Sequence, residues 1–233
     1  MSDSRPAKRA RLIKAVVKTR QQTQKTVIFI RIHKTGTTTI NDWLFPGGHY
    51  PHMLPAYIQR SLSEKEWEEA FKFTFVRNTY DRLVSVFSDF SDTTTPPRHC
   101  TAYYQRYFDK TRDQKKAFAR WVQDGCISHL SVLNPKRSDQ KNNFLPKRPM
   151  MLAEWLVDSE GKDYLDFIGR FESLEQDMFS LNKKLNLNRK ESVFPHKNRS
   201  RRDQDYRVYY TEETKAIVDE IFQDEITKFG FQF

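Results

Sequence analysis

Short apolar runs alternate with amphipathic stretches along most of the chain. Three runs are short and rich in β-branched and aromatic residues, which is typical of strands: residues 27–32 (VIFIRI), 71–76 (FKFTFV) and 164–171 (YLDFIGRF). In the stretches after them, apolar residues recur every three or four positions, which predicts helices. The predicted helices cover residues 37–44, 81–90, 114–123, 173–185 and 212–229. Strands that alternate with helices predict one α/β domain built on a parallel sheet.

The last predicted helix has the clearest boundary signals. Thr211 is a good N-cap residue, and the two glutamates that follow it suit the positive end of the helix dipole. A buried stripe is expected at Val218, Phe222, Ile226 and Phe229.

Composition narrows the class of protein. Aromatic residues make up 14% of the chain, too many for a disordered protein, and no apolar run approaches the roughly 18 residues of a membrane-spanning helix. The N-terminus has no apolar block typical of a secretory signal. The two cysteines, Cys100 and Cys126, suggest neither a disulfide framework nor a metal site. These features predict a cytoplasmic protein with free thiols.

Basic residues gather at the N-terminus. Residues 1–26 hold eight Lys and Arg and one acidic residue, so they carry +7 of the net charge of +10. We expect residues 1–26 to form a basic, partly disordered arm and residues 27–233 to form the domain. The arm has three alternative roles: it could bind a polyanion, it could bind a membrane surface, or PAKRAR could serve as a nuclear localisation signal. The nearly neutral remainder predicts no nucleic-acid-binding surface.

The segment HKTGTTT lies between the first strand and its helix, where backbone N–H groups and the helix dipole favour an anion. Gly36 allows a phosphate to approach the backbone, and Lys34 adds a positive charge. Threonine hydroxyls add hydrogen-bond donors, which explains β-branched residues at the start of a helix. The hydroxyl donors are Thr35, Thr37, Thr38 and Thr39. The alternative is an ordinary turn with Lys34 in solvent. A Walker nucleotide loop is not indicated, because its lysine follows the glycines.

Two segments together resemble a known family. VIFIRIHKTGTTTI followed by FKFTFVRNTYDRLVSVFSDF resembles the cofactor motifs of sulfotransferases that use 3′-phosphoadenosine 5′-phosphosulfate (PAPS), closest to the carbohydrate-type family 2. The resemblance covers about residues 27–233. It implies a single-domain, three-layer sandwich with a central parallel sheet, similar to P-loop nucleotide-binding folds. It departs from the family pattern at His33 and Thr79, where the family usually has proline, and in GTTT at 36–39, where it has Gly-Gly-Thr-Ser.

The resemblance also implies roles for individual residues. Residues 34–39 would wrap the 5′-phosphosulfate, with Lys34 stabilising the leaving phosphate, and no metal would be required. Arg77 and Ser85 would hold the 3′-phosphate, although a surface ion pair and the polar side of a helix are ordinary alternatives. In the basic loop 194–205, Asn198 and Ser200 are candidates for contacts with the 3′-phosphate or adenine, and Arg201 is a weaker one.

A hydroxyl acceptor needs a general base, and histidine suits neutral pH. Of six histidines, His49 and His52 lie where the chain returns from the first helix toward the carboxyl edge of the sheet. The resemblance favours His52, with Ile58 six positions later. His49 and a carboxylate remain alternatives.

The acceptor is left open between a glycan hydroxyl and a small molecule. The basic segment 136–148 would attract an anionic sugar chain. YYQRYF at 103–108 would line an acceptor pocket or, as the alternative that we favour, belong to the helix core. Two other functions remain: an ATP-dependent small-molecule kinase, and a non-enzymatic polyanion-binding protein that deletion of residues 1–26 would inactivate. The sequence predicts no oligomeric state.

Overall fold

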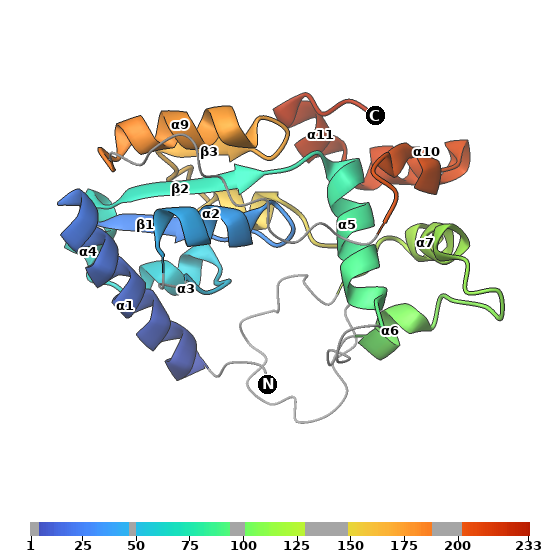
Figure 1. Cartoon of the computed structure of the whole chain (residues 1–233), viewed down its shortest axis with the longest axis horizontal. Helices are drawn as coiled ribbons and strands as arrows, with labels where there is room; N and C mark the ends of the chain where they lie inside the picture. The colour runs from blue at the N-terminus through green and yellow to red at the C-terminus, as the bar shows by residue number, and fades with distance from the viewer. Residues whose placement is uncertain (1–4, 47–49, 94–100, 129–148, 188–201) are drawn as a thin grey trace. The chain divides into compact units, whose positions relative to one another are not determined.

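The structure is a computed structural model that describes residues 5–46, 50–93, 101–128, 149–187 and 202–233. The chain forms two compact units (Figure 1). The first unit comprises Met1–Arg77 and Leu152–Arg199, and the second comprises Asn78–Met151 and Ser200–Phe233. Helices and a parallel sheet make this an α/β fold, as the sequence predicts.

The sheet of the first unit contains three parallel strands in the order β1-β2-β3, namely β1 (Val27–Ile30), β2 (Phe71–Val76) and β3 (Phe167–Arg170). The bounds of β2 are those predicted, whereas β1 and β3 are shorter than their apolar runs. Phe29 pairs with Phe73 across the sheet, and their rings stack with centroids 4.7 Å apart. Every residue of β1 is buried, which explains its uninterrupted apolar sequence.

The helices of the first unit are α1 (Arg5–Thr23), α2 (Thr37–Leu44), α3 (Pro55–Gln59), α4 (Glu64–Glu69), α8 (Ala153–Leu156) and α9 (Leu174–Lys184). The bounds of α2 are those predicted. Ser63 and Glu66 form a capping box that fixes the start of α4. Among the described residues, no helix is both long and apolar enough to cross a membrane.

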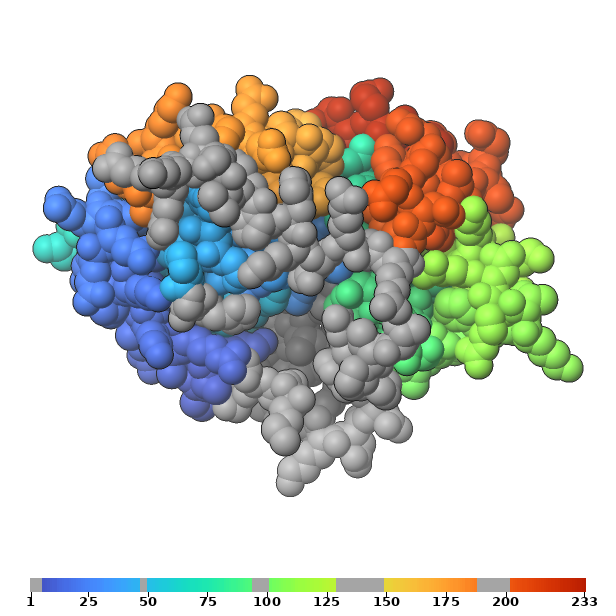
Figure 2. All heavy atoms as spheres, in the orientation of Figure 1, coloured from blue at the N-terminus to red at the C-terminus, as the bar shows by residue number. Residues whose placement is uncertain are grey.

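The N-terminal segment differs from the partly disordered arm that we expected, because residues Arg5–Thr23 form α1. One face of α1 packs beside β1 and buries Leu12, Ala15, Val16 and Thr19. These four positions have helical spacing, but the many basic residues between them hide the stripe. Figure 2 shows part of α1 on the surface as dark blue spheres, and its exposed positions include Arg9 and Lys14. The basic charge therefore lies on the outer face of a packed helix.

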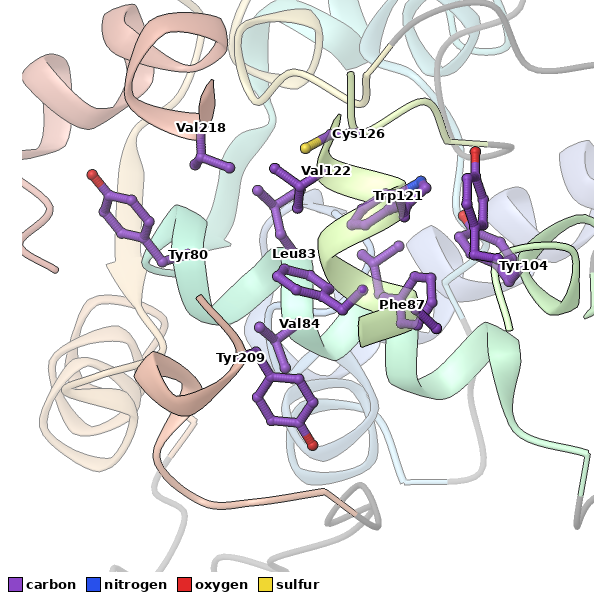
Figure 3. Close-up of a cluster of buried hydrophobic side chains, with 14 of the residues drawn as sticks. Tyr80, Leu83, Val84, Phe87, Tyr104, Trp121, Val122, Cys126, Tyr209 and Val218 are labelled. Atoms are coloured by element: carbon purple, nitrogen blue, oxygen red, sulfur yellow. The ribbon is translucent and has the colours of Figure 1, made fainter. Parts of the chain in front are cut away.

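The second unit is built from helices around an aromatic core. Its elements are α5 (Thr79–Ser91), α6 (Thr101–Gln105), α7 (Gln114–Gln123), the 3-10 helix η1 (Tyr206–Tyr209), α10 (Glu212–Ile221) and α11 (Gln223–Phe229). Phe87 of α5 packs against Tyr104 and Trp121, and Figure 3 shows the free thiol of Cys126 near Val122; all five residues are fully buried. The segment 103–108 thus contributes to the core, in agreement with the favoured alternative.

The C-terminal helix is divided, whereas the sequence predicts one helix over 212–229. Thr211 is the N-cap of α10 and forms a capping box with Thr214, which confirms the predicted start. No glycine or proline marks the division at Phe222 in the sequence. Val218 and Phe222 are buried as predicted, but Ile226 and Phe229 are only partly buried. Glu225 is buried instead, and a hydrophobic pattern cannot reveal a buried charge.

Candidate functional site

The loop after β1 has a backbone suited to an anion. Lys34 and Gly36 both have left-handed backbone angles, with φ of 68° and 77°. The Thr35 hydroxyl donates to the Ile32 carbonyl at 3.1 Å and closes the turn. Gly36 is the N-cap of α2 and has no side-chain oxygen with which to cap the first turn. The helix therefore begins with N–H groups that an anion can satisfy.

The threonines of this loop are mostly enclosed. Thr35, Thr37 and Thr39 are buried, while Thr38 and Lys34 are half-buried. A solvent-facing turn would leave these side chains exposed. The burial of three hydroxyl-bearing side chains at one helix start explains why this segment tolerates β-branched residues.

Arg77 follows β2 directly and contacts the loop. Its Nη1 donates to the Lys34 carbonyl at 3.1 Å, and its side chain is buried. The guanidinium carbon lies 4.0 Å from the centroid of the Phe171 ring, which follows β3. Because β1, β2 and β3 are parallel, Lys34, Arg77 and Phe171 meet at the carboxyl edge of the sheet.

Phe171 also supports Gly36. A Cβ atom on Gly36 would lie 2.9 Å from Cδ2 of Phe171, so only glycine fits this close approach. The role of Phe171 is not evident from the sequence. It lies at the end of the apolar run YLDFIGRF, and nothing in that run distinguishes a ring that supports a loop from a ring of the core.

His52 is attached to the same loop. Its Nδ1 lies 2.8 Å from the Arg31 carbonyl, which can only accept a hydrogen bond. Nδ1 therefore carries the proton of the neutral ring, and Nε2 carries the lone pair. The ring stacks on His33, with centroids 3.8 Å apart and an interplanar angle of 11°. His33 immediately precedes Lys34, so a histidine with a basic Nε2 lies near the loop lysine.

The segment before His52 is held by buried contacts. The Tyr50 N–H donates to Asn41 Oδ1 at 2.9 Å, and Arg31 donates to the Tyr50 carbonyl. Burial lowers the pKa of Arg31 to about 10, and the nearby carboxylate of Asp42 opposes this effect. The guanidinium remains charged at neutral pH and ties Tyr50 to the end of β1.

The other predicted residues belong to the second unit or lie outside the described residues. Ser85 belongs to α5 of the second unit and is buried, and its role stays a prediction. His49, Asn198, Ser200 and Arg201 lie outside the described residues, as does the basic segment 136–148.

The parallel sheet, with a strand–loop–helix segment at its carboxyl edge whose backbone suits an anion, defines an α/β protein. A model of the sulfotransferase family matches residues 18–232. The match spans most of the 233 residues, so the chain belongs to this family. It begins within α1, earlier than the resemblance from about residue 27. No curated protein and no solved structure gives a significant match to the chain.

Proposed function

We propose that this sulfotransferase uses PAPS as the sulfuryl donor and a hydroxyl group of a glycan or a small molecule as the acceptor. The observation that carries the proposal is the hydrogen bond from Arg77 to the Lys34 carbonyl. It joins the two segments that resemble the cofactor motifs of PAPS-dependent enzymes, although Lys34 and Arg77 are 43 positions apart in the sequence.

The residues at the sheet edge fit a ligand with two phosphate groups. The loop of residues 34–39 would hold the 5′-phosphosulfate through its backbone N–H groups and the hydroxyls of Thr37, Thr38 and Thr39. Arg77 would bind the 3′-phosphate, because a buried guanidinium held against a ring presents its donors in a fixed geometry. The family resemblance assigns Ser85, Asn198 and Ser200 to the same nucleotide, and these assignments stay predictions.

In this proposal Lys34 and His52 act on opposite sides of the transfer. Bound PAPS supplies the sulfuryl group, whose bond to the bridging oxygen breaks as a bond to the acceptor oxygen forms. Lys34 neutralises the negative charge that develops on the bridging oxygen, an effect typically worth about 10²–10³ in rate. Nε2 of His52 takes the proton of the acceptor hydroxyl, a role typically worth about 10²–10⁴. The hydrogen bond at Nδ1 favours the tautomer that this role requires.

Calorimetric titration with the desulfated product, 3′-phosphoadenosine 5′-phosphate (PAP), tests the donor. We expect binding at about micromolar Kd without magnesium, weakened at least about tenfold in Arg77→Ala, since charged hydrogen bonds are worth about 1.5–3 kcal/mol. Arg60→Ala, at an exposed arginine of the same unit, is the matched control and should bind like the parent protein. A preference for Mg-ATP would replace the proposal with a kinase. No binding of either nucleotide would overturn the donor assignment.

A further inference from the structure

His33 lies between two aromatic side chains of the first unit. Its ring stacks on the His52 ring, with centroids 3.8 Å apart. It also packs against the Trp155 ring of α8, where the angle between the two ring planes is 83° and the centroids are 6.0 Å apart. Trp155 is buried and therefore gives His33 a fixed support. The proposed reaction uses His52 but gives His33 no task.

The hydrogen bond from Nδ1 to the Arg31 carbonyl fixes one edge of the His52 ring. The His33 ring adds a second contact, because it lies against the face of His52 with centroids 3.8 Å apart and 11° between the two planes. A tilted His52 ring would collide with this flat surface, so the stack opposes rotation of the ring out of its plane.

The two restraints together decide where Nε2 points. The carbonyl selects the tautomer, and the stacked ring selects the plane, so the lone pair of Nε2 has one direction. General bases need such precision, since small misplacements of a reacting group cost large factors in rate.

We propose that His33 is a positioning residue whose flat ring, held between Trp155 and His52, orients the Nε2 lone pair of His52 toward the acceptor hydroxyl. This inference rests on the proposed function, in which His52 is the base. It assigns His33 no contact with the donor or the acceptor, and it requires a flat ring at residue 33 rather than a titrating one.

The test compares two variants of similar size. His33→Phe keeps a flat ring and removes the imidazole nitrogens, whereas His33→Leu removes the flat ring. Histidine-selective ¹⁵N and ¹³C NMR of the full chain, with His52 assigned through His52→Asn, reports the tautomer of its ring, and ¹³C relaxation reports how ordered the ring is. We expect the parent protein and His33→Phe to show a single tautomer protonated at Nδ1 and an ordered ring. In His33→Leu the carbonyl still selects this tautomer, so we expect the same tautomer but a disordered ring.

Two results would overturn the inference. A His52 ring in His33→Leu that is as ordered as in the parent protein would show that the stack is not needed. Disorder of that ring in both variants would show that the imidazole of His33, and not its flat shape, matters. If His33→Leu does not fold, Trp155→Leu replaces it, because this variant removes only the support behind His33. The tautomer and the order of the His52 ring are then measured in the same way.

PAP titration of the same variants separates this inference from the proposed function. We expect both His33 variants to bind PAP within about twofold of the parent protein, since His33 is assigned no contact with the donor. If the parent protein does not bind PAP, the proposed donor fails while the NMR comparison still decides whether His33 orients His52. An ordered His52 that does not matter for turnover, measured with His52→Asn, would overturn the base assignment alone.

Discussion

The guanidinium of Arg77 lies over the Phe171 ring, with its central carbon 4.0 Å from the ring centroid. The two residues come directly after neighbouring parallel strands, and the Phe171 N–H donates to the Val76 carbonyl at 2.8 Å. The sheet itself therefore holds the ring below the arginine. Stacking on an aromatic ring fixes the plane of the guanidinium.

Replacing Phe171 by leucine should weaken nucleotide binding without removing any charge. The loss of the stacking interaction is worth about 0.5–2 kcal/mol, so we expect PAP affinity to fall about two- to thirtyfold. Calorimetry measures the affinity, and thermal unfolding checks that the fold persists. Phe179→Leu, on α9 of the same unit, is the matched control. Equal affinity in Phe171→Leu and the parent protein would contradict the role given to the ring.

Gly36→Ala should damage both stability and binding. The new Cβ would lie 2.9 Å from Phe171, and φ of 77° is unfavourable for alanine by about 1–2 kcal/mol. We expect a loss of at least about 1 kcal/mol in the free energy of unfolding, measured in urea, and weaker PAP binding. Gly161→Ala separates the two causes, because φ there is 83° but nothing lies within 4 Å of the new Cβ. If Gly161→Ala loses as much stability as Gly36→Ala, the contact of the new Cβ with Phe171 adds nothing to the loss in the free energy of unfolding.

Glu225 and Arg82 form a buried ion pair in the second unit, with 2.8 Å between Oε1 and Nη2. The Thr79 hydroxyl donates to the same oxygen at 2.6 Å. Glu225→Ala would leave a buried guanidinium without its carboxylate, so we expect a loss of about 3–5 kcal/mol in the free energy of unfolding. The double variant Arg82→Met/Glu225→Leu should lose less than Glu225→Ala. Glu220→Ala, at an exposed position of α10, is the control. A loss in Glu225→Ala as small as the loss in Glu220→Ala would show that the buried ion pair does not stabilise the fold.

Burial raises the pKa of the Cys126 thiol, because a thiolate is costly in the aromatic core. Ellman's reagent should therefore fail to modify Cys126 in the folded Cys100→Ser protein, even at pH 9, and should react fully in urea. Since the folded pKa is raised, the stability that Cys126 contributes is complete below the unfolded value of about 8.5 and declines above it. Rapid labelling of the folded protein at pH 9 would show that the thiol is accessible.

The sequence predicts local structure best where one local signal decides it. The helix at Thr37–Leu44 and the strand at Phe71–Val76 have their predicted bounds, because glycine, proline and alternating polarity mark their ends. Residues 34–39 also carry a local signal, namely a strand, a glycine and a run of hydroxyls within a few positions, and phosphate binding there stays a prediction from it.

Long-range packing explains what the sequence left out. The stack of Phe171 on Arg77 and that of His33 on His52 each join residues that are distant in the chain, and no local pattern reveals such a contact. Charge was misleading in two places. The basic residues of α1 hid its buried stripe, and the buried Glu225 interrupts the apolar pattern of the last helix.

The contacts of α1 bear on how the protein can be shortened. The Thr19 hydroxyl lies 3.1 Å from the Tyr50 hydroxyl, which donates to the Val27 carbonyl, and Lys8 Nζ reaches the His52 carbonyl at 3.5 Å. Deletion of residues 1–26 would remove these contacts and uncover one side of β1. A truncated protein that has lost activity would thus say nothing about polyanions. Charge reversal on the outer face, at Arg9 and Lys14, changes the electrostatics and keeps the helix that supports the histidine.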